Sequence, residues 1–208
     1  ENVGVEDVNI TGKNSVGGLV GRSDGGSISG SYATGSLTGL GDYLGGLVGH
    51  NMGGADLTLS YATVDVNGSV SSDFVGGLVG ANTDTALVAE TYAIGAVDGG
   101  TVGGLIGDNG ATVTDSYWNT KTTNQKSSAG GTSRTTAQMT GSDALEAGNM
   151  GGFTNAWSTN ANIEIGDTQV FPTLTANAQT PPPSESLYAG GNGTDTSPYQ
   201  IETWEQLN

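Results

Sequence analysis

The hexapeptide Val16-Gly17-Gly18-Leu19-Val20-Gly21 organises this chain, because close copies of it return three more times. The later copies begin at Leu44, Val75 and Val102. The leucine at position 19 recurs at 47, 78 and 105, which gives steps of 28, 31 and 27 residues. Self-similarity at such a period predicts a stack of repeated structural units.

A second unit follows each copy and places an aliphatic residue four positions before a tyrosine. The pairs are Ile28 and Tyr32, Leu57 and Tyr61, Val88 and Tyr92, and Val113 and Tyr117. Length varies between the units and not inside them, as expected when strands hold their register and surface turns vary. We therefore expect the tyrosines to stack inside the repeat array, with the aliphatic residues as a parallel ladder beside them.

These patterns predict an all-β fold, a right-handed parallel β-solenoid of about four coils over residues 1–118. Equivalent residues align in ladders in such a stack, and parallel crossovers are overwhelmingly right-handed. Within the hexapeptide, strand alternation predicts Val16 and Val20 on one face and Leu19 on the other. The opening residues fit the same frame with Val5 in the tyrosine position and Ile10 five residues later, so they predict half of an earlier repeat.

The composition excludes several classes of protein. Of 208 residues, 37 are glycine, none is cysteine, and 21 acidic residues against 5 basic ones give a net charge of −16. Nucleic acid and anionic membranes are poor partners for such a chain, because both need clustered Lys and Arg. No apolar run is long enough to cross a bilayer. The chain begins with Glu1, which suggests a processed product or a fragment.

The recurring Gly-Leu-Val-Gly, followed by Ser31-Tyr32-Ala33-Thr34-Gly35, resembles the GLUG-motif repeat family over residues 13–118. Proteins of that family are large secreted and cell-surface proteins of microbes, including adhesins and non-catalytic parts of surface proteases. The resemblance implies a β-helix-like scaffold that is secreted or at the cell surface. The family has no catalytic motif that could be transferred to residues of this chain.

The C-terminal third breaks the period. Residues 119–176 predict a cap over the last coil, with short helices near 135–139 and 142–146. Residues 177–187 contain three consecutive prolines and predict an extended linker. Residues 188–208 resemble the segment that normally starts a GLUG array.

Little chemistry is available for a reactive site. His50 is the only histidine, and with no cysteine a zinc site of the usual kind is excluded. Most turn aspartates are expected to cap turns, and a sugar-cleaving pair stays a minor alternative. Calcium is the only cofactor hypothesis, with Asp24, Asp84 and Asp108 as candidate ligands. Candidate glycosylation sequons begin at Asn9, Asn67 and Asn192.

The leading hypothesis is a non-enzymatic extracellular structural or adhesive module. The alternatives are a glycan-binding or polysaccharide-processing β-helix and the spacer region of a surface protease. The expected partners are copies of the chain, neighbouring modules of the same polypeptide, and cell-surface glycans.

The open first coil at Val5 and Ile10 predicts an assembly site for the tail of a neighbouring copy, which would form a head-to-tail filament. The tail residues in this hypothesis are Tyr199, Ile201, Trp204 and Leu207. The alternative is a cut through a tandem array, with the tail belonging to the next module.

Overall fold

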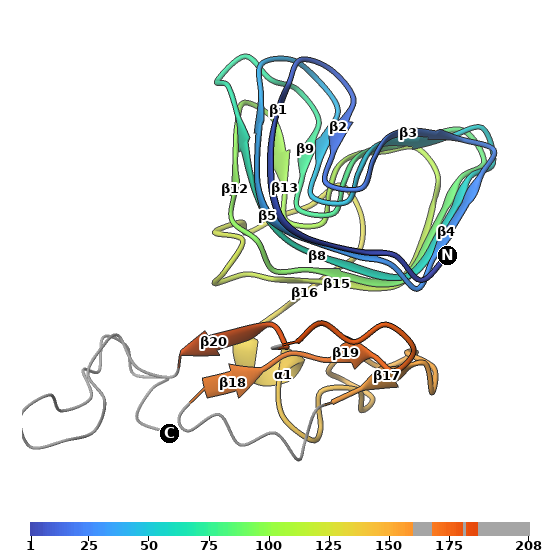
Figure 1. Ribbon diagram of the computed structural model, residues 1–208, viewed down its shortest axis with the longest axis vertical. Coiled ribbons are helices and arrows are strands. Elements are labelled where there is room, and N and C mark those ends of the chain that lie inside the picture. Colours follow the sequence, from blue (N-terminus) through green and yellow to red (C-terminus); the bar gives the residue numbers. More distant parts are fainter. Residues whose placement is uncertain (160–167, 181, 187–208) are drawn as a thin grey trace, which may run out of the picture.

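A computed structural model describes residues 1–159, 168–180 and 182–186. The repeat region forms a parallel β-solenoid, in which three sheets run along the stack of about four coils (Figure 1). In the described residues no helix is long and apolar enough to cross a membrane.

Sheet A forms the outer wall, and its strands are joined in the order β1-β5-β8-β11-β15-β16, with β4 and β12 also paired to β8. Its strands are β1 (Gly4–Gly12), β4 (Ser27–Ser29), β5 (Tyr32–Gly39), β8 (Asp56–Gly68), β11 (Leu87–Ala93), β12 (Val97–Asp98), β15 (Thr112–Asn119) and β16 (Thr132–Arg134). The strands of sheet B are β2 (Val16–Gly17), β6 (Leu44–Gly45), β9 (Val75–Gly76) and β13 (Val102–Gly103). Those of sheet C are β3 (Val20–Asp24), β7 (Val48–Met52), β10 (Val79–Asn82) and β14 (Ile106–Asn109).

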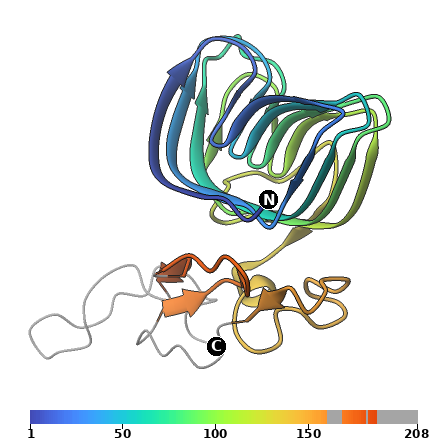
Figure 2. The same cartoon turned by 45° about the vertical axis from the view of Figure 1, so that its right-hand side comes forward.

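Each hexapeptide is a sharp bend and not a single strand. Sheet B runs inward from the rim of the coil, and sheet C leads back out, so the wall folds into its own interior (Figures 1 and 2). Gly18 and Leu19 lie in the bend between the two sheets. Val16, Leu19 and Val20 consequently all pack on one apolar core, and the prediction that Leu19 faces the opposite side is wrong. Strand alternation does not apply across a bend.

Steric crowding explains the glycines of this bend. A Cβ on Gly17 would lie 2.3 Å from the carbonyl oxygen of Val20. One on Gly18 would lie 2.4 Å from the oxygen of Gly46 and 2.9 Å from the Cβ of Ala33 in the opposite wall. Only glycine allows the backbone to approach this closely.

The tyrosine and aliphatic ladders are confirmed. Tyr32, Tyr61 and Tyr92 stack with ring centroids 5.0 and 4.9 Å apart. The strand register aligns Ile28, Leu57, Val88 and Val113 in the second ladder.

The tyrosines nevertheless point outward, away from the solenoid interior, so their predicted side is wrong. The residue two positions before each tyrosine has a positive φ, including 47° at Leu59 and 52° at Glu90. This left-handed residue turns the wall and interrupts the alternation of side chains. Leu57 therefore packs inside with Ala62, whereas Tyr61 lies outside.

The first strand departs from the predicted alignment by one residue. Gly4 pairs with Tyr32 and Val5 pairs with Ala33, so Val5 does not occupy the tyrosine position. Ile10 does align with Leu37, as predicted. A bulge between Val5 and Val8 supplies the extra residue, which a sequence offset cannot reveal.

Residues 119–134 cover the last coil. Trp118 replaces the small alanine of earlier coils and is 5% exposed. Beyond it, the N–H of Gly104 donates to the carbonyl of Ser127, and that of Ala129 donates to Ile106. Strand β16 pairs with β15 and completes this cover.

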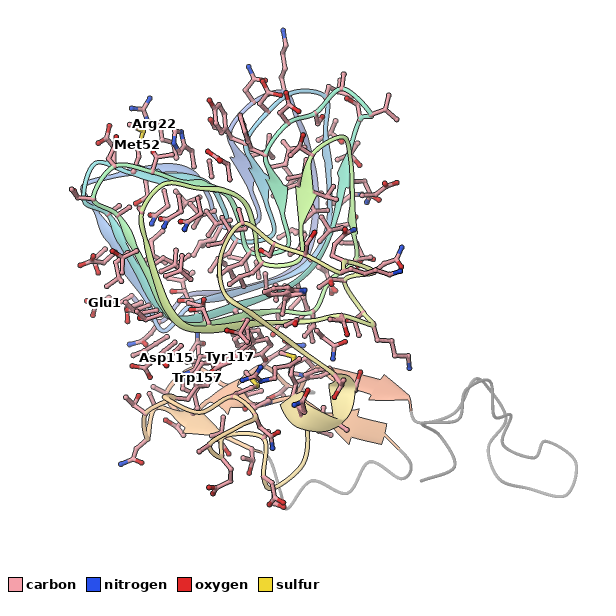
Figure 3. All side chains as sticks on the ribbon, turned by 180° about the vertical axis from the view of Figure 1, so that it is seen from behind. Glu1, Arg22, Met52, Asp115, Tyr117 and Trp157 are labelled. Carbon is pink, nitrogen blue, oxygen red and sulfur yellow. The ribbon has the colours of Figure 1, made fainter. Side chains whose placement is uncertain are left out.

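The C-terminal segment (135–159, 168–180 and 182–186) packs against the outer tyrosine face, which consists of Tyr32, Tyr61, Tyr92 and Tyr117 (Figure 3). It contains α1 (Thr136–Met139), β17 (Trp157–Ser158), β18 (Thr168–Val170), β19 (Thr173–Leu174) and β20 (Ser184–Ser186). Thr135 and Gln138 form a capping box at α1, whereas 142–146 form turns and no helix.

The described part of 177–187 also differs from the expected extended linker. Strand β20 pairs with β18, and Asn177 donates to the carbonyl of Gly30 in the first coil.

Candidate functional site

The candidate calcium ligands lie in three different surroundings. Asp24 forms an exposed ion pair with Arg22, 2.9 Å between Nη2 and Oδ2. Asp84 accepts a hydrogen bond from the N–H of Gly53 at 3.3 Å. Asp108 is half-buried on β14, beside Ala81 of β10. Within the described ranges, no three His, Asp or Glu side chains gather closely enough to hold a metal ion.

Other aspartates join the coils, as the turn-capping interpretation expects. Asp42 Oδ1 accepts from the N–H of Asp73 at 3.0 Å, and Asp73 Oδ1 accepts from the hydroxyl of Thr101 at 2.8 Å. Asn14 Oδ1 binds the N–H of Asp42 in the same way one coil earlier. These side chains therefore form hydrogen bonds that connect the turns of successive coils.

His50 lies in a half-buried aromatic stack at the mouth of the bend. Its ring is 4.7 Å from that of Tyr43 and nearly parallel to it, and Tyr43 also stacks on Phe74 at 5.4 Å. His50 Nε2 lies 3.0 Å from the hydroxyl oxygen of Thr83. Burial, followed by the positive charge of Arg22, lowers the pKa of His50. This surrounding favours a neutral imidazole that supports the turn.

The predicted assembly and sequon residues are only partly described. Val5 and Ile10 are half-buried on the edge strand β1. Tyr199, Ile201, Trp204, Leu207 and Asn192 lie outside the described residues. Asn9 and Asn67 are exposed on sheet A, and the Asn67 amide donates to the carbonyl of Leu37 at 3.5 Å.

A ladder of stacked asparagines, which was not predicted from the sequence, runs through the second, third and fourth coils. Asn51 Nδ2 donates to Asn82 Oδ1 at 3.0 Å, and Asn82 Nδ2 donates to Asn109 Oδ1 at 2.9 Å. Each amide also donates to a backbone carbonyl, such as Leu87 for Asn51. Each asparagine stands four residues after the central leucine of its hexapeptide, an offset that would have revealed the ladder.

The ladder ends with an unpaired atom. Asn51 Oδ1 is buried and accepts no hydrogen bond from the described residues, and the first coil places Ser23 beside Asn51. Serine is too short to donate as an asparagine would. A buried acceptor without a donor destabilises the folded state.

We expect Ser23→Asn to stabilise the protein by about 0.5–1.5 kcal/mol, because the new amide would donate to Asn51 Oδ1. Thermal unfolding measures the gain. The matched control is Ser27→Asn, at an exposed position of β4, which should leave the melting temperature unchanged. A Ser23→Asn protein that melts no higher than the control would contradict the ladder geometry.

Burial dominates the chemistry of the outer tyrosine face. It raises the pKa of Tyr32 to about 12, and the hydrogen bond from its hydroxyl to Glu6, at 2.7 Å, adds to the effect. Burial also raises the pKa of Tyr61, of Tyr92 and of Tyr117. These hydroxyls therefore stay protonated in the folded protein and donate hydrogen bonds to their neighbours.

We expect the protein to lose stability when the pH rises above 10. A tyrosine whose pKa is raised on folding stabilises fully below the unfolded pKa of 10.0, and this contribution is lost as pH rises toward the folded value, about 12 for Tyr32. Melting temperatures measured across this range test the expectation. Tyr32→Phe should reduce the alkaline loss. An equal alkaline loss in the Tyr32→Phe protein would argue against this linkage.

The fold and its ladders define a parallel β-solenoid held together by stacked polar and aromatic side chains. When the sequence is compared with models of known protein families, the model of the GLUG motif matches residues 12–38 and 41–67. The chain thus carries two GLUG motifs, which form most of the first two coils. The strand register of these coils continues through the third and fourth coils beyond the matched residues. No curated protein and no solved structure matches the chain.

Proposed function

We propose that the protein is a non-enzymatic structural module of a secreted or cell-surface protein, with an adhesive role. The observation that carries this proposal is the use of polar side chains for stacking. Asn51, Asn82 and Asp42 all bond to neighbouring coils, which favours a stiff scaffold over a reactive site. We also propose right-handed winding, as parallel crossovers favour. An experimental structure with left-handed coils would overturn that point.

The adhesive role is tested by displaying the chain on non-adherent cells. On surfaces coated with cell-wall polysaccharide, more of the cells that display the unaltered chain should be retained than of the cells that display the Leu78→Asp variant. This control places a charge at a fully buried core position and should not fold. Equal retention of the two cell populations would contradict adhesion.

The non-enzymatic character is tested separately. Glycoside hydrolysis needs a pair of carboxyl groups positioned to act on the bond. Asp65 and Asp73 instead accept hydrogen bonds from Ala96 and Thr101 in the next coil. The purified protein should release no new reducing ends from polysaccharides. Release that disappears in an Asp65→Asn or Asp73→Asn protein would show an enzyme.

We further propose the head-to-tail assembly through the tail 188–208. Its support is that, among the described strands, β1 pairs with β5 on one side and with no strand on its other side. The bulge and the charges of Glu6 and Asp7 restrict pairing to the straight part of the strand near Ile10. Negative-stain images should show filaments for the intact chain and monomers after deletion of 188–208. Filaments in both, or in neither, would reject tail docking.

A further inference from the structure

The positive charge of this chain is concentrated in residues 119–134, the segment that covers the last coil. Three of the 5 Lys and Arg residues lie there, namely Lys121, Lys126 and Arg134, and the segment contains no acidic residue. Arg134 is half-buried over the ring of Tyr117, whereas both lysines are exposed. This segment, here called the basic cover, thus contrasts with a chain whose net charge is −16. Charge segregated in this way steers association with a partner of complementary charge.

Hydrogen bonds hold the two lysines at the end of the stack. The backbone N–H of Lys121 donates to Asn119 Oδ1 at 2.9 Å, which closes a turn at the end of β15. Lys126 follows Gln125, whose side-chain amide donates to the carbonyl of Val97 at 2.7 Å. The backbone that carries both charges is therefore attached to the solenoid.

The opposite end of the stack is acidic. Strand β1 begins the strand order of sheet A and β16 ends it, so β1 and the basic cover lie at opposite ends (Figure 2). Glu6 and Asp7 are exposed on β1. The basic residues of this part of the chain lie elsewhere, because Lys13 follows the far end of β1 and Arg22 forms its ion pair with Asp24 on β3.

The strand register relates the acidic residues to the basic cover. One column of aligned residues runs along sheet A and consists of Val5, Ala33, Ala62, Ala93 and Trp118. Glu6 and Asp7 directly follow the first member of this column, and Lys121 lies three residues after the last member. A copy stacked along the same axis would therefore bring its acidic residues over the basic cover of its neighbour.

A second copy fits the basic cover better than an anionic polymer does. Two exposed lysines offer few contacts to a polyanion, and the net charge of −16 repels one. Glu6 and Asp7, in contrast, lie at the bulge between Val5 and Val8, where a docking strand cannot continue its pairing. Their carboxylates consequently stay accessible when a tail pairs with the straight part of β1 near Ile10.

We propose that the basic cover of one copy docks on the β1 end of a second copy, with Lys121 and Lys126 opposite Glu6 and Asp7. This contact rests on the proposed head-to-tail assembly and deepens it, because it names the surfaces that align successive copies. The tail supplies the apolar attachment, and the charges set the direction of stacking. Since these charges are exposed to solvent, salt weakens the contact.

Sedimentation velocity of the full chain measures the contact through self-association. The dissociation constant should rise about tenfold between low salt and about 0.5 M NaCl. Lys121→Gln combined with Lys126→Gln should raise it about tenfold at low salt. The matched control combines Val70→Glu with Thr85→Glu, which changes the net charge equally at exposed positions between the two ends of the stack. The control should associate like the unaltered chain, and circular dichroism verifies that both variants fold.

A charge exchange tests the pairing itself. One variant carries Lys121→Glu and Lys126→Glu. The other carries Glu6→Lys and Asp7→Asn, because asparagine tolerates the positive φ of 54° at this position. Each variant alone should associate more weakly than the unaltered chain, since its two ends then carry charge of the same sign. An equimolar mixture should recover the association.

The proposal is overturned if the Lys→Gln variant associates like the control, if salt leaves association unchanged, or if the mixture recovers nothing. It is also overturned if the unaltered chain stays monomeric and the two lysines bind polygalacturonate, the polyanion probe, instead.

Deletion of 188–208 separates this contact from tail docking. If the truncated chain still associates and the Lys→Gln changes abolish that association, the basic cover contact stands and tail docking fails. If truncation abolishes association and the Lys→Gln changes have no effect, tail docking stands and the basic cover contact fails.

Discussion

Gly77→Ala is expected to prevent the chain from reaching its native fold, at a cost above about 4 kcal/mol. Gly77 lies in the bend of the third coil. A Cβ there would lie 2.3 Å from the carbonyl oxygen of Gly104 and 3.0 Å from the Cβ of Ala93. Ala93 lies on strand β11, and Gly104 lies in the next bend, between β13 and β14, so neither can move aside without breaking hydrogen bonds between the coils. Circular dichroism and the yield of soluble protein measure the loss.

Gly110→Ala is the matched control. Gly110 follows a sheet C strand, as Gly77 follows a sheet B strand, but a Cβ at Gly110 would meet no atom within 4 Å. We expect its melting temperature to stay within a few degrees of the original. Similar behaviour of the two variants would mean that the glycines of the hexapeptide do not set the inward bend.

Tyr92→Ala should destabilise the protein by about 3–5 kcal/mol, the range for large buried aromatic residues. Tyr92 is 0% exposed and stacks on Tyr61. Its ring also contacts Trp157 and Phe171 of the C-terminal segment, with centroids 5.5 and 6.5 Å away. The substitution would open a cavity between the solenoid and that segment. Denaturant unfolding measures the change.

Two comparisons isolate the ring. Tyr92→Phe keeps the stack and loses only the hydroxyl bond to Pro172, so it should cost about 1 kcal/mol. Tyr43→Ala removes a half-buried tyrosine that stacks at the mouth of the bend, and its loss should be clearly smaller. If Tyr43→Ala and Tyr92→Ala lost equal stability, the outer tyrosine face would not be a second core.

Constant offsets predicted which residues align between coils, because parallel strands preserve register. They therefore predicted the ladders of Tyr61 and Leu57, together with the alignment of Ile10. They could not predict which side of the wall each ladder faces. That depends on single left-handed residues such as Leu59, whose conformation follows from packing and not from residue type.

The candidate sites were harder to predict for a related reason. The position of Val5 depends on a bulge, and the inward bend depends on contacts such as Gly18 with Ala33. The asparagine ladder could have been predicted from the sequence, because each asparagine stands at the same offset from its hexapeptide.

The C-terminal segment changes how this solenoid should unfold. In an array whose coils contact only their neighbours, terminal coils can detach one at a time. Here Asn177 bonds to Gly30 of the first coil and Gln179 to Tyr61 of the second. Pro172 bonds to Tyr92 of the third, and Gly151 to Tyr117 of the fourth. The C-terminal segment thus forms a hydrogen bond with each of the four coils. A terminal coil can detach only if its contact with this segment also breaks. We therefore expect the array to unfold cooperatively, like a globular domain.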